Sequence, residues 1–376
     1  MHKMISKKRA IIYSVIIVIA TALITSQVVG FKYKGYDKIA GLKRTIDKDF
    51  YKDPDNEKLM TGSIKGMFES LDDPYSQYYT KEEFEKLQEQ TSGSYVGIGV
   101  VIGPTSDDEL ITVVSPIEGS PAEKSGIKSG DKIIKVNGKE VTSKDMDKAM
   151  SLIKGKAGTD VKLTIKRGSE VLDINVKREE IVMKTIDSKV LENDIGYIKI
   201  SSFDEHTYDD FKKALNNLNK KGIKGLVLDL RDNPGGLLNI CDDIADEILP
   251  EGDTIVSVKD NSGKAKYLKS DNNRELDLPI ALLINGGSAS ASEILTGAIV
   301  DNNRGIAIGT TTFGKGLVQT VRGLNDGTGY KLTTAQYYTP SGDYINKKGI
   351  KPKIEEKDEN KQLQVAIDWM NNQINK

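Results

Sequence analysis

The chain begins with a basic segment followed by a long apolar run. Residues 1–9 carry four Lys or Arg side chains, and residues 10–30 carry no charged side chain. A run of this length is about what a helix needs to cross a bilayer. Because positive charge is typical of the cytoplasmic flank of a span, we expect a cytoplasmic tail at residues 1–9 and an uncleaved transmembrane anchor at residues 10–30. The body would then lie outside the cytoplasm at the cell membrane. A cleaved signal peptide is the alternative, and it would also export the body.

Residues 31–90 have a helical pattern. Apolar side chains recur at helix spacing, for example at Ile39, Leu42 and Ile46. The pattern stops before Pro74, because the residue that precedes a proline avoids helical backbone angles. We interpret residues 31–90 as a helical N-terminal segment that packs against other parts and has no chemistry of its own.

Residues 91–178 instead alternate short apolar strands with glycine-rich turns, which predicts a small β-rich domain. The expected strands are 96–102, 110–114, 132–136, 161–167 and 171–176, with one helix at 143–153. At the start of this domain, two glycines flank Ile98. Such a loop can present backbone N–H groups to a carboxylate, while the strand after it pairs with an extended peptide. The residues of this candidate peptide site are Tyr95, Val96, Gly97, Ile98, Gly99 and Val100.

Residues 179–358 alternate strands with helices, which predicts an α/β core whose largely parallel sheet is covered by helices. The expected strands are 195–200, 226–230, 280–284 and 305–309, and the expected helices are 208–220, 237–249 and 291–301. Residues 359–376 are expected to form a polar C-terminal helix. No period of 20–50 residues repeats along the chain, which excludes a solenoid.

Composition narrows the classes of ligand. The 376 residues include 54 Lys and Arg against 55 Asp and Glu, and the net charge of −1 gives no electrostatic case for nucleic acid as a partner. One Cys excludes an internal disulfide, and one Cys with two His excludes a zinc site built on those side chains. Cys241 lies in an apolar helical run and is interpreted as a small buried residue. The nearby acidic residues Asp242, Asp243, Asp246 and Glu247 are interpreted as a solvated helix face, so neither a metal nor another cofactor is predicted.

A turn of small residues between a predicted strand and a predicted helix carries three serines, Ser288, Ser290 and Ser292. The free N–H groups and the positive dipole end of a helix N-terminus favour a developing oxyanion. A simple N-cap is the alternative, because serine is common there. Further along the chain, Lys315 lies between two glycines. A lysine acts as a general base only when it is neutral, which requires burial that lowers its pKa from about 10.4 toward neutrality.

Three other motifs each fail at a required position. The string from Gly309 to Gly316 begins like a phosphate-binding loop, but glycine stands where Ser or Thr would hold magnesium. The loop at Gly97 lacks the third glycine of a dinucleotide fingerprint at the required place. A Ser-His-Asp triad would need His206, which lies in a polar loop that leads into a helix, and no Gly-x-Ser-x-Gly elbow occurs.

Several strings taken together point to one family. Residues 95–100 with 119–127 and 130–138 resemble a PDZ domain of the bacterial protease type. The other strings are 71–76, 229–236, 287–293, 313–319, 332–335 and 338–342. Over residues 36–355 the chain resembles the carboxyl-terminal processing proteases, also called tail-specific proteases.

That resemblance implies a crotonase-like (ClpP-like) α/β protease core with a PDZ domain inserted before it. It also implies that Ser290 is the nucleophile, that Lys315 is the general base, and that Gln319 orients the lysine. The four-residue spacing would place Lys315 and Gln319 on one face of a helix. The backbone N–H groups implied for the oxyanion hole are those of Ala291 and of Gly235 or Gly236.

We therefore expect a serine endopeptidase that recognises unstructured C-termini of exported polypeptides through its PDZ domain. Its partners would be those polypeptides and the membrane, with a homo-oligomer left open. One alternative is a catalytically silent PDZ adaptor at the outer face of the membrane, against which the intact Ser290, Lys315 and Gln319 argue. Another is a crotonase-type acyl-transfer enzyme, against which the exported location and the PDZ domain argue.

Overall fold

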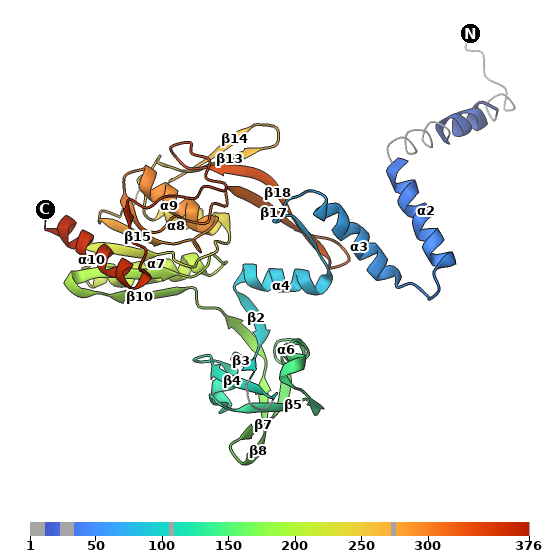
Figure 1. Cartoon of the computed structure of the whole chain (residues 1–376), viewed down its shortest axis with the longest axis horizontal. Helices are drawn as coiled ribbons and strands as arrows, with labels where there is room; N and C mark the ends of the chain where they lie inside the picture. Colours follow the sequence, from blue (N-terminus) through green and yellow to red (C-terminus); the bar gives the residue numbers. More distant parts are fainter. Residues whose placement is uncertain (1–11, 23–33, 105–108, 272–275, 376) are drawn as a thin grey trace, which may run out of the picture. The chain divides into compact units, whose positions relative to one another are not determined.

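The computed structural model divides the chain into two compact units (Figure 1). The units are Met1–Asp72 and Asp73–Lys376. The residues that the structure describes are 12–22, 34–104, 109–271 and 276–375.

The described part of the first unit consists of helices joined by short loops. Residues 12–22 form a helix, and α2 (Lys34–Asp49) and α3 (Asn56–Glu69) follow. Helix α3 begins where the Asp55 carboxylate accepts a hydrogen bond from the Lys58 N–H at 3.1 Å, which is a typical N-cap. Within the described ranges, no helix combines the length and the apolar character needed to cross a bilayer. The anchor expected at residues 10–30 lies partly outside those ranges.

A strand interrupts the segment that was expected to be helical. Between α3 and α4 (Lys81–Ser92) lies β1 (Gln77–Tyr79), which pairs antiparallel with β18 (Gly329–Tyr338). The structure differs from the expectation because this pairing is a long-range contact, and local periodicity does not reveal it. Helix α4 then begins with a capping box, in which Thr80 and Glu83 satisfy each other's backbone N–H groups.

The β-rich domain contains a sheet of strand order β3-β4-β5-β7-β8, with β6 paired to β5, and a separate pair of β2 and β9. Its strands are β2 (Ser94–Gly97), β3 (Val100–Pro104), β4 (Ile111–Pro116), β5 (Lys132–Val136), β6 (Lys139–Glu140), β7 (Asp160–Arg167), β8 (Glu170–Lys177) and β9 (Glu179–Val182). Its helical elements are α5 (Pro121–Lys124), the 3₁₀ turn η1 (Ser143–Asp145) and α6 (Met146–Ile153). The single strand expected at 96–102 is divided into β2 and β3, because Gly99 has a left-handed φ of 72° and breaks the strand.

The larger domain is built on a sheet of strand order β10-β11-β12-β15-β16-β19. Its strands are β10 (Ile186–Val190), β11 (Ile195–Ile200), β12 (Gly225–Asp229), β15 (Ile280–Ile284), β16 (Gly305–Gly309) and β19 (Ile354–Glu355). Its strands β11, β12, β15, β16 and β19 pair in parallel, and the edge strand β10 is antiparallel to β11. This pairing confirms the prediction of a largely parallel sheet.

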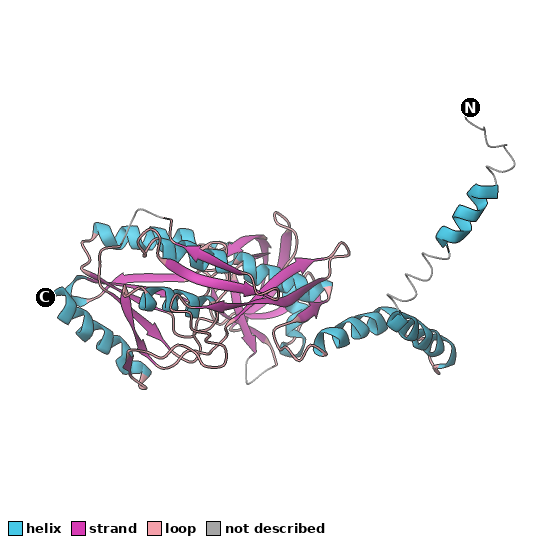
Figure 2. Ribbon diagram, turned by 90° about the horizontal axis from the view of Figure 1, so that it is seen from above, coloured by secondary structure: helices cyan, strands magenta, loops and turns pink. Residues whose placement is uncertain are grey.

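Helices cover both faces of this sheet. They are α7 (Thr207–Lys220), α8 (Leu238–Asp246), α9 (Ala291–Asp301) and α10 (Glu359–Ile374). Leu226 and Leu228 of β12 belong to a hydrophobic core shared with α7, α8 and α9. Val227, between them, belongs to a second core shared with α10, which ends at the C-terminus of the chain (Figure 2). Successive strand residues point to opposite faces, so a strand that is buried throughout needs both layers.

A second sheet of the larger domain has the strand order β1-β18-β13-β14, with β17 paired to β18. Its further strands are β13 (Thr254–Asp260), β14 (Ala265–Lys269) and β17 (Leu317–Gly323). Strands β17 and β18 form an antiparallel hairpin (Figure 1). Lys315 lies just before this hairpin and Gln319 lies within it, so the hairpin determines where both side chains are placed.

Candidate active site

Ser290 lies at the sharp turn between strand β15 and helix α9. Its backbone has φ 54° and ψ −113°, a conformation that is costly for a residue with a side chain. The turn is held by the Asn285 side chain, whose Oδ1 accepts from the Gly287 N–H and from the Asp232 N–H, each at 3.0 Å. A strained residue held by its surroundings is typical of functional sites.

The structure distinguishes the three serines of this turn. The Ser288 hydroxyl donates to the Leu230 carbonyl at 2.8 Å, and the Ser292 hydroxyl donates to the Asn233 carbonyl at 2.9 Å. Both of these side chains are fully buried. Ser290 instead lines an open cleft, so it is the serine of the three that a substrate can reach.

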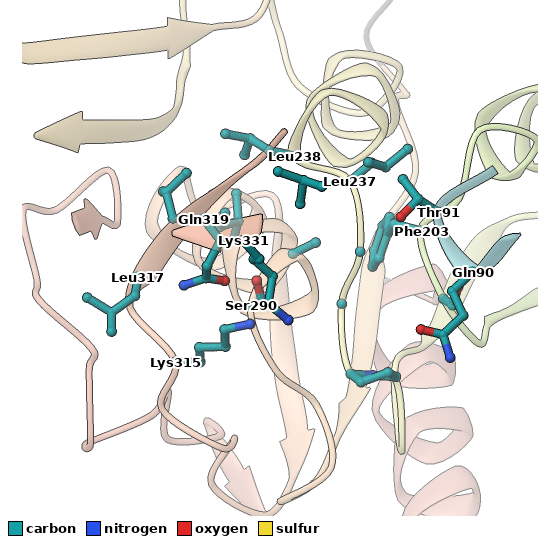
Figure 3. Close-up of a pocket in the computed structure, with 18 of the residues that line it drawn as sticks. Gln90, Thr91, Phe203, Leu237, Leu238, Ser290, Lys315, Leu317, Gln319 and Lys331 are labelled. Carbon is teal, nitrogen blue, oxygen red and sulfur yellow. The ribbon is translucent and has the colours of Figure 1, made fainter. Parts of the chain in front are cut away.

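The cleft has a volume of about 670 Å³ (Figure 3). Its lining is mainly apolar and includes Leu87, Met183, Phe203, Leu237, Leu238, Ile294, Leu317, Val318 and Val321. Among the described residues that line it, the charged side chains are Lys315 and Lys331, and none is Asp or Glu. As far as the described residues line it, the cleft is therefore an apolar groove with two amines and no carboxylate.

Lys315 is half-buried in this cleft. Burial is the larger cause that lowers the pKa of Lys315 from that of an ordinary lysine, and the positive charge of Lys331 is the second cause. The carboxylates of Glu293 and Asp73 act in the opposite direction but do not outweigh these two effects. The amine is thus more easily neutral than an exposed lysine, as a general base must be.

The Lys315 side chain reaches toward Ser290 (Figure 3). Figure 3 shows its amine pointing toward Ser290. Its Nζ lies 4.8 Å from the centroid of the Tyr75 ring, which packs against the amine as part of its partly buried surroundings. The structure thus brings Ser290 and Lys315, which the sequence analysis paired, into one cleft.

Gln319 lies in the same cleft, but on a strand and not on a helix. The expected helical face shared by Lys315 and Gln319 was therefore wrong. Lys315 precedes β17 and Gln319 lies within it, and both residues line the cleft. The Gln319 Nε2 donates to the Thr333 hydroxyl of β18 at 3.3 Å.

The buried carboxylate of Glu293 connects the two chain segments of the site. Its Oε2 accepts hydrogen bonds from the Ser290 N–H at 2.9 Å and from the Lys315 N–H at 2.8 Å. Its Oε1 accepts from the Gly314 N–H at 2.7 Å and from the Thr312 hydroxyl at 2.6 Å. This role of Glu293 was not predicted from the sequence, although a serine followed three residues later by Glu is the signal of a capping box.

The turn at residues 233–236 supplies the remaining polar groups. The fully buried Asn233 accepts from the Gly235 N–H at 2.8 Å, so this N–H, one of the expected oxyanion donors, already has an acceptor. For the N–H groups of Gly236 and Ala291, the structure shows no acceptor among the residues it describes. A Cβ on Gly235 would lie 2.8 Å from the Ser290 Cβ, which shows how closely the turn approaches the nucleophile.

A second pocket of about 240 Å³ lies in the β-rich domain. Its lining is Tyr95, Gly97, Ile98, Gly99, Val100, Ile102, Met150, Ile153 and Lys154. Of the six residues expected at the peptide site, five line this pocket, and Val96 does not. Helix α6 contributes Met150 and Ile153 to this lining.

The region of Cys241 holds no further site that the structure supports. Cys241 is fully buried, as expected, and burial raises the pKa of its thiol. Its Sγ donates to the Ala291 carbonyl at 3.1 Å. Burial and the neighbouring Asp243 raise the pKa of Asp242 to about 6. No group of His, Cys, Asp or Glu in the described part of the chain is arranged to hold a metal ion.

Comparison with known proteins agrees with this geometry. Three family models match: peptidase family S41 at residues 194–356, the PDZ domain at 95–177, and the activating protease CtpB N-terminal domain at 20–83. The carboxy-terminal processing protease CtpA of Bacillus subtilis (strain 168) is 43% identical over 320 residues, which are 85% of this chain and 68% of that protein. The chain belongs to the carboxyl-terminal processing protease family.

Further members and structures are also similar. The probable CtpA-like serine protease of Staphylococcus aureus (strain N315) is 40% identical over 349 residues, or 92% of this chain and 70% of that protein. The structure of a photosystem II D1 C-terminal processing protease is 31% identical, covers 85% of this chain and 86% of its own, and has a TM-score of 0.51. A putative S41 protease from Bacteroides fragilis NCTC 9343 shares the fold, with 18% identity, a TM-score of 0.54, and coverage of 86% and 91% of the two chains.

As a member of the carboxyl-terminal processing protease family, this chain is a serine-type peptidase of family S41. It carries a PDZ domain and a helical N-terminal segment.

Proposed function

We propose that this peptidase hydrolyses exported polypeptides with a Ser290–Lys315 dyad. The observation that carries the proposal is the half-buried Lys315 amine, whose lowered pKa and position in the cleft of Ser290 suit a general base. Lys315 takes the proton of the Ser290 hydroxyl as Oγ bonds to the substrate carbonyl carbon. The tetrahedral intermediate then breaks its C–N bond, and the proton passes from Lys315 to the leaving amine. Water releases the acyl group from Ser290 in a second step of the same kind.

The oxyanion of the intermediate would be stabilised by the backbone N–H groups of Ala291 and Gly236. The absence of an acceptor for either N–H among the described residues supports this assignment. The N–H of Gly235 is assigned a structural role, because Asn233 already accepts from it. Gln319 would keep Lys315 in position from strand β17. Hydrogen-bond donors that are already in place where negative charge develops stabilise the transition state more than donors that must first reorganise.

The PDZ domain would capture the unstructured C-termini of substrates in the pocket at residues 95–100. The glycines of this loop allow the backbone to turn, and the apolar lining suits the last side chain of a peptide. The charge pattern of residues 1–30 supports a body held outside the cytoplasm by a membrane anchor. The core around Ser290 would be crotonase-like.

The proposal is tested with the full chain and an unfolded protein substrate such as β-casein. Wild type should cleave it, and Ser290→Ala and Lys315→Ala should each abolish cleavage. Ser262→Ala and Lys269→Ala are matched controls, because both side chains are exposed, lie at or beside the β13–β14 hairpin and do not line the cleft. Cleavage that survives either dyad mutation would refute the dyad. Peptide binding without any cleavage by wild type would instead support the adaptor.

A further inference from the structure

Lys331 is a cation in the cleft that the proposed chemistry does not use. It lies on strand β18, opposite Val321 of β17, and both side chains line the cleft. Lys331 and Ser290 line the same cleft (Figure 3). Gln319 and Thr333 are opposite one another two residues further along the hairpin, so alternation places all four side chains on the same face. The position of Lys331 therefore follows from the pairing of the hairpin.

Lys331 has no acidic partner in the part of the chain that the structure describes. No ion pair among the described residues involves it, and its Nζ lies 5.8 Å from the centroid of the Tyr79 ring. The side chain is half-buried. A partly buried charge without a partner costs free energy, and a group of opposite charge relieves this cost.

The other described residues that line the cleft do not supply an acidic partner for Lys331. The described residues that line it include Lys331 and Lys315 but no Asp or Glu. Lys315 must be neutral to act as a base, so Lys331 supplies the positive charge of the cleft. A peptide that fills an apolar groove also displaces water, which strengthens the attraction between opposite charges.

We infer that Lys331 binds a carboxylate of the substrate and so gives the cleft a preference for acidic peptides, an inference that rests on the proposed function. The carboxylate has two sources, an Asp or Glu side chain near the scissile bond or the C-terminus of the peptide itself. Both present the same two oxygens to an ammonium group. Lys331 is thus a specificity residue, distinct from the residues that transfer protons.

The experiment compares kcat/KM for matched peptides. One Asp is moved through the three positions on each side of the scissile bond, and each peptide is paired with its Asn counterpart. A second set compares free and amidated C-termini. We expect wild type to favour the acidic member of at least one pair by roughly tenfold, as for a hydrogen bond to a charged group. In Lys331→Met the ratio of kcat/KM for the Asp peptide to that for the Asn peptide should fall to about one. In Lys331→Glu the preference should invert, so that a peptide with Lys at this position is cleaved better than the Asp peptide.

Ratios separate substrate binding from effects on the base. Any change in the charge of Lys315 acts equally on both peptides of a pair, so it cancels. Arg322→Met is the matched control, because Arg322 is an exposed cation of the same hairpin that lies next to Val321 and therefore on the other face. It should keep the wild-type ratio. A preference for free C-termini that survives Lys331→Met but disappears in Gly99→Ala belongs to the PDZ domain and not to Lys331.

Failure of this inference is distinguishable from failure of the dyad. If Ser290→Ala removes cleavage and the ratio is the same in wild type and Lys331→Met, the carboxylate site is refuted and the dyad stands. If Ser290→Ala still cleaves, the dyad is refuted. Acetylation of Lys331, followed by mass spectrometry in full-length Ser290→Ala, tests the site without activity. The acidic peptide should protect Lys331 and the Asn peptide should not, and equal protection would overturn the inference.

Discussion

The carboxylate of Glu293 accepts a hydrogen bond from the backbone N–H of Lys315 at 2.8 Å, across the gap between helix α9 and the segment that leads into β17. The same oxygen accepts from the Ser290 N–H at 2.9 Å. One fully buried side chain therefore holds the backbone of both dyad residues. Through these bonds, Glu293 sets the position of the Lys315 backbone relative to that of Ser290.

Replacing Glu293 with Gln should lower kcat by at least about tenfold. An amide nitrogen cannot accept hydrogen bonds, so at least one group among the N–H groups of Ser290, Lys315 and Gly314 would lose its acceptor in a buried site, at a cost of about 1–3 kcal/mol. Steady-state kinetics and a thermal unfolding midpoint would be measured together. If kcat equals that of wild type, Glu293 does not position the dyad.

The pH profile should report the charge on Lys315. Activity requires the neutral amine, so it should fall as the pH drops through the pKa of Lys315. Burial and the nearby charge of Lys331 lower that pKa, so activity should persist at a lower pH than an exposed lysine would allow. The measurement is kcat/KM across the stable pH range, with Arg322→Met as a control.

Two substitutions should move the acidic limb of the pH profile, where activity is lost as Lys315 becomes protonated, in opposite directions. Lys331→Met removes a repulsion on protonated Lys315, so the pKa of Lys315 should rise and the limb should move to higher pH. Glu293→Gln removes an attraction, so that pKa should fall and the limb should move to lower pH. Shifts in the same direction, or no shift, would contradict the assignment of Lys315 as the base.

The turn beside the nucleophile should not tolerate a side chain at Gly236. A Cβ there would lie 2.1 Å from the Phe203 carbonyl oxygen, so the backbone must move. Displacing this oxyanion donor should reduce kcat by roughly 100- to 1,000-fold. The control is Gly286→Ala, because a Cβ on Gly286 meets nothing within 4 Å. Comparable kcat values for the two variants would show that the Gly236 N–H is not a donor of the oxyanion hole.

Peptide capture by the PDZ domain should depend on Gly99. Its φ of 72° is unfavourable for other residues, and a Cβ would lie 2.4 Å from the Ser120 Cβ. Gly99→Ala should therefore weaken binding of a labelled peptide with a free C-terminus by at least tenfold, measured by fluorescence anisotropy in full-length Ser290→Ala. Gly103→Ala, whose Cβ would make an ordinary 3.5 Å contact, should bind as before. Equal affinities would place the peptide elsewhere.

Much of the architecture was predictable from the sequence because it follows from local patterns. Strands β11, β15 and β16 and helix α9 have the expected bounds, since each is an apolar or periodic run that ends at a polar or glycine-containing turn. The strand-helix alternation also predicted the parallel sheet. The small residues of the turn before α9, and a lysine between glycines, marked the segments that the structure brings together in one cleft.

Other features depended on contacts between segments far apart in the sequence. The pairing of β17 with β18 places Gln319 on a strand and brings Lys331 into the cleft, and nothing in the residues next to either one indicates this. The family resemblance implied Ser290 rather than Ser288 or Ser292, and the hydrogen bonds of the two buried hydroxyls supply the physical reason.

The sequence by itself therefore determined the order of the elements, because periodicity and turn chemistry act over a few residues, and its resemblance to one family implied which groups react. Only the tertiary structure decided which N–H groups remain available to an oxyanion, how Glu293 links Ser290 to Lys315, and which amine is left without a carboxylate. Those outcomes depend on distances and burial, which are properties of the packed chain.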